Sequence, residues 1–155
     1  MQPYELDHID ERLIATLALC PRAGMLQIAR DVGVARNTAQ AHLDRLTREG
    51  VITGFGPEVD LRRLGYGVSA FVSLEIAQGS GSSVDEHLES IPEVVEAYMT
   101  TGSSDLLCRV VARDNDHLGQ LISRMVDLPG VIRTTTSLIL ATRIAPRTRA
   151  VVHAG

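Results

Sequence analysis

The period of the hydrophobic residues changes once along the chain, and this change limits the fold more than any other feature. In the first 50 residues apolar side chains recur every three or four positions, as at Ile9, Leu13 and Leu17, which is typical of amphipathic helices. From Tyr66 onward apolar and polar residues alternate, which is typical of a strand with one buried face. The sequence therefore predicts two domains of different class.

Capping and breaking residues divide the first part into three short helices. Asp7 is well placed to cap the first helix, and Pro21 ends it. The second helix ends at Gly33, and the third spans about residues 36–49. Val51–Phe55 is a candidate strand, so we expect a helix-turn-helix domain with a winged-helix-like character.

The second part predicts the order β-α-β-β-α-β, the ferredoxin-like arrangement, so the chain as a whole is of the α+β class. An internal repeat supports this order, because IPEVVEA at 91–97 and LPGVIRT at 128–134 describe the same corner from helix to strand. The expected divisions are a helix-turn-helix domain at 1–55, a linker at 56–65, a regulatory and oligomerisation domain at 66–145, and a tail at 146–155.

One face of the predicted antiparallel sheet has no helix over it. We expect this open face to carry Phe71 and Leu138 or their neighbours, and an uncovered apolar face needs a partner. The expected partner is a second copy of the chain, packed sheet against sheet in a twofold-symmetric homodimer.

Residues 25–49 fit a helix, a tight turn and a second helix, the arrangement with which many proteins read the major groove of DNA. Short polar and basic side chains then face outward from the second helix. The expected base readers are Arg36, Asn37 and Gln40, and the expected phosphate contacts and flanking residues are Thr38, His42, Arg45 and Arg48. The alternative is a three-helix bundle whose polar face is only solvated.

The charge distribution favours the DNA interpretation, although the whole chain has a net charge of −4. Residues 22–48 contain five arginines and two aspartates, so this segment is locally basic while the rest of the chain is acidic. A small basic segment on an acidic body is expected of a DNA-binding domain joined to a larger domain with another task.

Motifs for catalysis and metal binding are missing from the sequence. All 15 basic residues are arginines, which excludes Schiff-base and P-loop lysines. The five histidines are dispersed, and Asp114 and Asp116 are interpreted as a helix cap. We expect no enzyme, cofactor or metal, and we expect Cys20 and Cys108 to be small buried residues. Without a signal or a long apolar segment, the expected location is the cytoplasm and not a membrane.

The turn Gly102-Ser103-Ser104-Asp105 between two predicted strands has two interpretations. It is either a polar hairpin turn or a set of backbone N–H groups that bind the carboxylate of a small ligand. The threonines at 134–136 likewise have a structural and a functional interpretation, because threonine favours strands and its hydroxyl can also line a polar cleft.

Taken together, these residues resemble the Lrp/AsnC, or feast/famine, family of bacterial and archaeal transcription regulators. The resemblance spans Leu6 to about Ile144 and is carried by LDHIDERLIATLAL, IARDVGVARNTAQAHLDRLTREGVITGF and TGSSDLL. It implies binding to double-stranded DNA, dimers that assemble further, often to octamers, and an amino-acid effector bound between dimers near the Gly-x-x-Asp turn. The effector residues that it implies are Thr101, Gly102, Ser103, Ser104, Asp105, Thr134 and Thr136.

The chain departs from the family pattern at three points. Ala35 stands where the recognition helix usually has a serine cap, and Ala41 and His42 stand where it often has two basic residues. Ser104 replaces a bulky, often aromatic residue. An alternative function is an amino-acid-binding module that docks on a partner protein instead of DNA.

Overall fold

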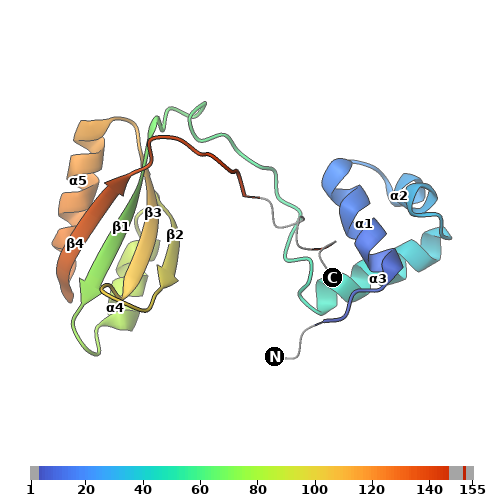
Figure 1. Ribbon diagram of the computed structural model, residues 1–155, viewed down its shortest axis with the longest axis horizontal. Coiled ribbons are helices and arrows are strands. Elements are labelled where there is room, and N and C mark those ends of the chain that lie inside the picture. Colours follow the sequence, from blue (N-terminus) through green and yellow to red (C-terminus); the bar gives the residue numbers. More distant parts are fainter. Residues whose placement is uncertain (1–3, 147–151, 153–155) are drawn as a thin grey trace. The chain divides into compact units, whose positions relative to one another are not determined.

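The computed structural model describes residues 4–146 and 152, and its ribbon is drawn in Figure 1. The chain divides into two compact units, of which the second is Val59–Arg143 and the first contains the described residues before and after it. The expected tail at 146–155 lies almost wholly outside the described residues. The two units are described separately below.

The first unit consists of three helices, as the sequence predicts: α1 (His8–Leu19), α2 (Met25–Val32) and α3 (Arg36–Arg48). The carboxylate of Asp7 accepts the backbone N–H groups of Ile9 and Asp10 and so caps α1, as expected. Gly33 ends α2 with φ of +79°, a left-handed conformation that favours glycine. The helices enclose a small apolar core formed by Leu13, Ile28, Val32 and Leu46.

The predicted strand at Val51–Phe55 is wrong. Among residues 4–146 the first strand begins at Val68. The backbone N–H groups of Val51 and Ile52 donate to the carbonyl of Leu46, so they close the end of α3 instead of joining a sheet. The described part of this unit contains no strand with which they could pair, and a strand needs a paired neighbour.

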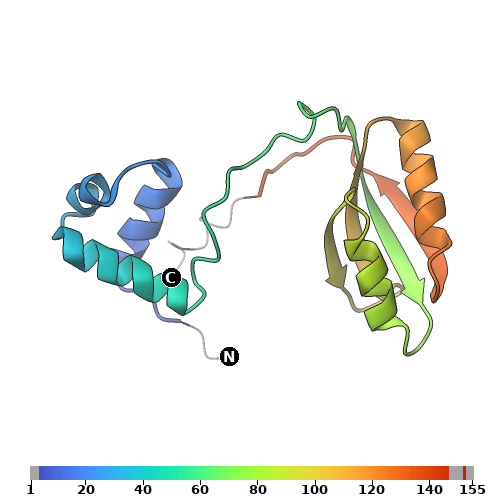
Figure 2. The ribbon, with the colours of Figure 1, turned by 180° about the vertical axis from the view of Figure 1, so that it is seen from behind.

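The second unit is a four-stranded antiparallel sheet with two helices on one face, which confirms the predicted ferredoxin-like fold (Figure 2). The strands follow one another across the sheet in the order β2-β3-β1-β4. The elements are β1 (Val68–Ile76), α4 (Gly81–Glu89), β2 (Val94–Met99), β3 (Leu106–Ala112), α5 (Asn115–Val126) and β4 (Val131–Leu138).

The core of this unit lies between the sheet and its two helices. Ala70, Val72 and Leu74 of the central strand β1 are fully buried there, as their alternation predicts. Cys108 is buried with them, and burial raises the pKa of its thiol to about 11. Cys20 is exposed, contrary to expectation, because it lies beyond the last residue of α1.

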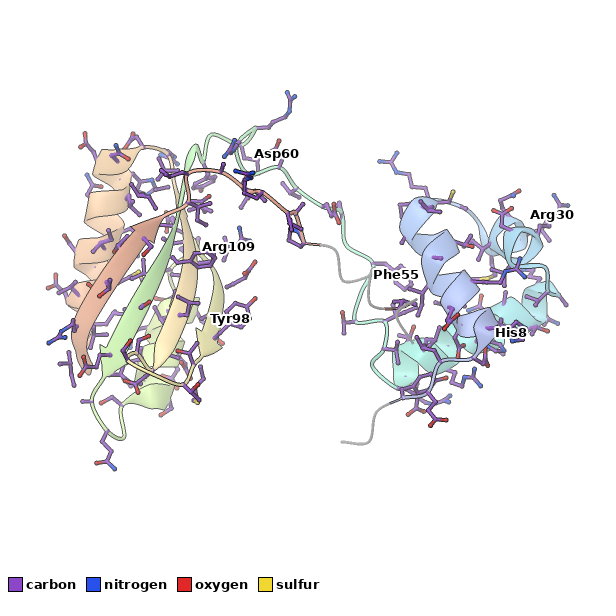
Figure 3. All side chains as sticks on the ribbon, viewed as in Figure 1. His8, Arg30, Phe55, Asp60, Tyr98 and Arg109 are labelled. Carbon is purple, nitrogen blue, oxygen red and sulfur yellow. The ribbon has the colours of Figure 1, made fainter. Side chains whose placement is uncertain are left out.

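The open face of the sheet differs from the expected one at Leu138. Leu138 pairs with Ala70, and directly paired residues of antiparallel strands point to the same face, so its side chain is on the helix-covered side. It is nevertheless 52% exposed, because β4 is an edge strand. Phe71 does lie on the open face, next to Arg109 of β3, and Figure 3 labels Arg109 and Tyr98 there.

Candidate functional site

The outward face of α3 is polar and exposed. Its exposed side chains include five of the seven predicted DNA contacts, namely Arg36, Asn37, Thr38, Gln40 and Arg48. The Nε2 of Gln40 donates to Asp44 over 2.8 Å, and the Nε of Arg48 lies 3.3 Å from a carboxylate oxygen of Glu49. Arginine, asparagine and glutamine offer the donors that base edges accept, so this face has the chemistry of a major-groove reader.

The first turn of α3 has no side-chain cap. Ala35 occupies the capping position with φ of −67° and ψ of 149°, and its methyl group cannot accept a hydrogen bond. The free N–H groups and the helix dipole make this end of α3 attractive to an anion, and Thr38 lies beside it. The missing cap therefore leaves donors that a DNA phosphate can satisfy.

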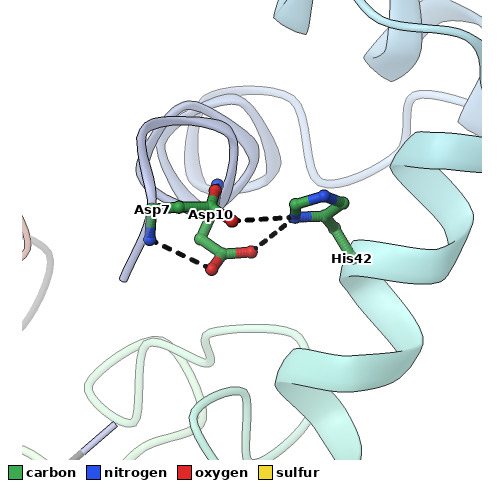
Figure 4. Close-up of side chains that lie close together, drawn as sticks. All are labelled: Asp7, Asp10 and His42. Carbon is green, nitrogen blue, oxygen red and sulfur yellow. Dashed lines mark hydrogen bonds and ion pairs between the residues drawn. The ribbon is translucent and has the colours of Figure 1, made fainter. Parts of the chain in front are cut away.

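His42 and Arg45, which the sequence predicts as DNA contacts, also bind acidic residues within the helical domain, and their contact with DNA stays a prediction. The Nδ1 of His42 lies 2.7 Å from Oδ1 of Asp10, and Nη2 of Arg45 lies 3.0 Å from both oxygens of the same carboxylate. Nη2 also donates to Asp7 over 2.9 Å. Figure 4 shows Asp7, the N-cap of α1, and Asp10 on α1 facing His42 on α3. Helix periodicity placed both side chains on a flank, but it could not reveal a partner more than 30 residues away.

The same cluster has the composition of a metal site but contains its own cation. Asp7, Asp10 and His42 offer three ligand-type atoms within 4.8 Å of one another. The Nη2 of Arg45 is 2.9–3.1 Å from these atoms, so the guanidinium takes the place that a metal ion would need. Burial disfavours the charged form of Asp10, yet hydrogen bonds from His42 and Arg45 outweigh it and lower the pKa of Asp10. We therefore describe the cluster as an internal ion-pair network.

The predicted effector turn, Thr101–Asp105, joins β2 to β3. The hydroxyl of Thr100 donates to the carbonyl of Ser104, and the backbone N–H of Thr100 donates to the carbonyl of Asp105. Gly102 has φ of +115°, which only glycine adopts easily. Within residues 4–146, no acceptor contacts the backbone N–H groups of Gly102 and Ser103, so they are available to a ligand carboxylate.

Thr134 and Thr136 do not lie beside this turn in one chain. They pair with Leu74 and Val72 of β1, and β1 separates them from Asp105, which bonds to Leu74 from the other side. Both threonines are half-buried and point to the helix-covered face of the sheet. The seven expected effector residues therefore form two groups within a single chain.

A hollow of about 410 Å³ lies between α4 and β2, beside the turn that joins β2 to β3. Sequence reasoning missed this hollow. Met99 and Leu106, the two residues that flank the turn region, line it together with Leu88. Asp85 and Glu89 from α4 add carboxylates to the same lining. The sequence offers no local signal for such a hollow, because its lining comes from three separate elements, α4, β2 and β3.

Comparisons with known proteins agree with this geometry. Residues 6–53 match the winged helix-turn-helix DNA-binding family, and residues 69–148 match the Lrp/AsnC ligand binding domain. The HTH-type transcriptional regulator FL11 of Pyrococcus horikoshii is 31% identical over 137 residues, which cover 88% of this chain and 91% of that protein. Regulatory protein AsnC of Escherichia coli is 28% identical over 141 residues, covering 90% of this chain and 93% of AsnC.

Solved structures show the same likeness. The structure of E. coli AsnC matches with a TM-score of 0.86 over 94% of this chain and 99% of that chain, at 28% identity. The feast or famine regulatory protein Rv3291c of M. tuberculosis, complexed with L-methionine, matches with a TM-score of 0.83 over 93% and 98% of the two chains, also at 28% identity.

The relatives are transcriptional regulators and not enzymes, as expected for this chain. In the part of the chain that the structure describes, every helix is too short or too polar to cross a membrane. A DNA-binding unit and a ligand-binding unit follow each other in the order of the matched families. The chain belongs to the Lrp/AsnC family of DNA-binding transcriptional regulators.

Proposed function

We propose that the protein recognises a specific DNA sequence by placing α3 in the major groove. Arg36, Asn37 and Gln40 then contact base edges, and Thr38 and Arg48 bind phosphates. The observation that carries this assignment is the exposure of all five side chains on α3, a helix whose N-terminus has no side-chain cap. In a dimer, two such helices would read half-sites about 34 Å apart along the duplex.

The hydrogen bond between Gln40 and Asp44 supports the role of Gln40. One N–H of the Gln40 amide donates to Asp44, which fixes the plane of the amide on the helix surface. The amide oxygen and the second N–H remain available, and this pair matches the N6 and N7 edge of adenine. Asp44 thus orients the Gln40 amide in the protein without DNA.

The DNA contacts are tested by selecting duplexes from a random 30-base-pair library with the full-length protein at low salt. We expect enrichment of a palindromic sequence, and a double substitution of Arg36→Ala with Gln40→Ala should weaken its binding at least tenfold. Arg63→Ala removes an equal charge from a side chain that is 89% exposed outside α3, and it should have little effect. Failure to enrich any duplex would refute the assignment and favour docking on a partner protein.

We propose that the effector is an amino acid whose carboxylate binds the free N–H groups of Gly102 and Ser103. Its side chain would enter the hollow between α4 and β2, where Leu88, Met99 and Leu106 supply apolar contacts. The complex of Rv3291c with L-methionine supports an amino acid of this size and polarity. Asp85 and Glu89 offer carboxylates to its ammonium group.

The separation of Thr134 and Thr136 from the turn supports a site shared between copies. Because β1 stands between the two groups in one chain, a ligand that contacts both kinds of residue is best enclosed when a second copy brings its β4 to the turn of the first. Sheet-to-sheet dimers, formed through the open face that carries Phe71, would then assemble further around the effector. An oligomer linked to a bound amino acid is a route by which the effector can change DNA binding.

Isothermal titration of the full-length protein with L-methionine tests this site. Thr134→Val should weaken binding, whereas Thr135→Val, which changes the next residue on the opposite face of β4, should not. Light scattering with and without L-methionine should show a change in mass that only Thr134→Val suppresses. Equal effects of both substitutions, or a constant mass, would exclude the shared site.

A further inference from the structure

The carboxylate of Asp10 connects the first helix to the recognition helix. Asp10 is 0% exposed and is the only fully buried charged residue among those described. One oxygen, Oδ1, contacts Nδ1 of His42 at 2.7 Å and Nη2 of Arg45 at 3.0 Å. The other, Oδ2, accepts Nη2 of Arg45, the backbone N–H of Asp7 at 3.2 Å and the hydroxyl of Tyr4 at 3.3 Å. A single buried carboxylate therefore holds donors from three parts of the domain.

The apolar contacts of α3 do not fix its rotation about its own axis. Its two fully buried apolar side chains are Ala39 and Leu46, and they form one narrow stripe. Such contacts are not directional, so a small roll of the helix changes the buried area little. Base readers, in contrast, must be held within about 0.5 Å and 10–20° of their working positions.

The polar contacts of α3 with Asp10 are directional and can fix the rotation of this helix. His42 and Arg45 are three residues apart, on the same side of α3, and both contact Asp10. Hydrogen bonds have preferred angles, and charge-assisted ones are the stronger kind, so two of them on one acceptor fix both the roll and the position of the helix. His42 contributes a proton from Nδ1, because its short contact is with a carboxylate that accepts.

We propose that Asp10 is a positioning residue for sequence recognition, acting through His42 and Arg45 to orient the base-reading face of α3. The inference rests on the DNA contacts proposed above for Arg36, Asn37 and Gln40. Asp10 touches no DNA in this scheme. Its effect is on the discrimination between sequences, because rotated base readers lose their hydrogen bonds while flexible phosphate contacts adapt.

The test measures binding of the full-length protein to the selected duplex and to a scrambled duplex of the same length. Asp10→Asn keeps the side-chain shape but places an amide opposite two donors, and it should reduce the ratio of the two affinities about tenfold or more. The dependence of scrambled-duplex binding on salt should stay the same, because the phosphate contacts remain. Ile28→Val is the matched control, since it weakens the same domain core without touching Asp10.

A pair of substitutions at His42 keeps the test decisive if Asp10→Asn does not fold. His42→Asn retains an N–H close to the place of Nδ1 and should preserve the affinity ratio, whereas His42→Leu removes the donor and should lower it. Equal ratios for both His42 variants, or an equal loss in Ile28→Val, would overturn the positioning role while leaving DNA binding intact. Failure of the wild-type protein to prefer any duplex would instead overturn the proposed DNA contacts and this inference with them.

Discussion

The Oδ2 atom of Asp105 accepts the backbone N–H of Ile76 over 2.8 Å, which ties the turn after β2 to the end of β1. The backbone of Asp105 adds a second link, because its N–H donates to the carbonyl of Leu74 over 2.8 Å. A residue expected to bind an effector thus has a structural task in the free protein. Its other oxygen, Oδ1, has no partner among the described residues.

Removing this carboxylate should loosen the end of β1. Asp105→Ala leaves the N–H of Ile76 without its acceptor, at a cost of about 1 kcal/mol, so the amide proton of Ile76 should exchange about fivefold faster. Asp105→Asn keeps an acceptor oxygen and should show a smaller effect. Hydrogen exchange by NMR on the full chain measures both, and equal exchange rates in wild type and Asp105→Ala would contradict the prediction.

Restoring the missing cap of α3 should stabilise the helical domain. Ala35 already has the extended backbone of a capping residue, so Ala35→Ser should add a hydrogen bond to the first turn and about 1 kcal/mol of unfolding free energy. The control is Ala41→Ser, which introduces the same residue into the exposed middle of α3 and should cost ~0.5 kcal/mol. Urea unfolding followed through resonances of α1–α3 distinguishes the two, and the prediction fails if both variants change stability in the same direction.

The ion-pair network should make the helical domain sensitive to acid. Burial opposes ionisation of Asp7 and Asp10, but their hydrogen bonds prevail and hold the pKa of each below the ordinary value of 3.8. A carboxyl group with a lowered folded pKa contributes stability above its unfolded pKa and loses that contribution as the pH falls through the folded value. Stability should therefore be constant from pH 7 to about 5 with respect to these groups and should fall below pH 4.

Urea unfolding of the helical domain at pH 6 and pH 3 measures this loss. Asp10→Asn should unfold with a smaller difference between the two pH values than the wild type, because it no longer has the titrating group. Glu5→Gln, which changes an exposed carboxylate outside the network, should retain the full difference. Identical differences in all three proteins would show that the network does not govern acid sensitivity.

The corner before β4 should tolerate only glycine. Gly130 has φ of +94°, and a Cβ atom there would lie 2.5 Å from the Cβ of Ser80. Gly130→Ala should therefore destabilise the sheet domain by about 2–3 kcal/mol, and adding Ser80→Gly should recover part of this loss. Gly119→Ala, in open space on α5, should instead stabilise it by about 1 kcal/mol. Thermal unfolding of the full chain measures all three, and a stable Gly130→Ala would be inconsistent with the geometry.

Local patterns predicted most of the fold. The alternation around Val72 identified the buried face of β1, and capping residues such as Asp7 marked helix starts within a residue or two. Both signals act over a few neighbours, so one sequence is enough to see them. The strand expected at Val51–Phe55 failed because β-branched residues favour strands only where a neighbouring strand is present, and the sequence does not show neighbours.

The candidate site was only partly predictable for the same reason. Exposure of Arg36 and Gln40 follows from helical periodicity, and the structure bears it out. The engagement of Arg45 by Asp10 depends on how α1 packs on α3, which links residues 35 positions apart. The hollow beside Met99 is likewise lined by residues from three elements, α4, β2 and β3. Contacts between distant segments decide such features, and no local pattern encodes them.

The strand order also has a consequence for how the protein is made. Among the described residues, the core of the helical domain is formed within residues 4–52, so this core can form while the ribosome is still adding the rest. The central strand β1 has to wait, because one of its two neighbours is β4, the last strand among residues 4–146 to leave the exit tunnel. A nascent chain therefore has a finished DNA-reading module before it has a ligand-binding one, and premature termination before β4 would release the first without its regulator.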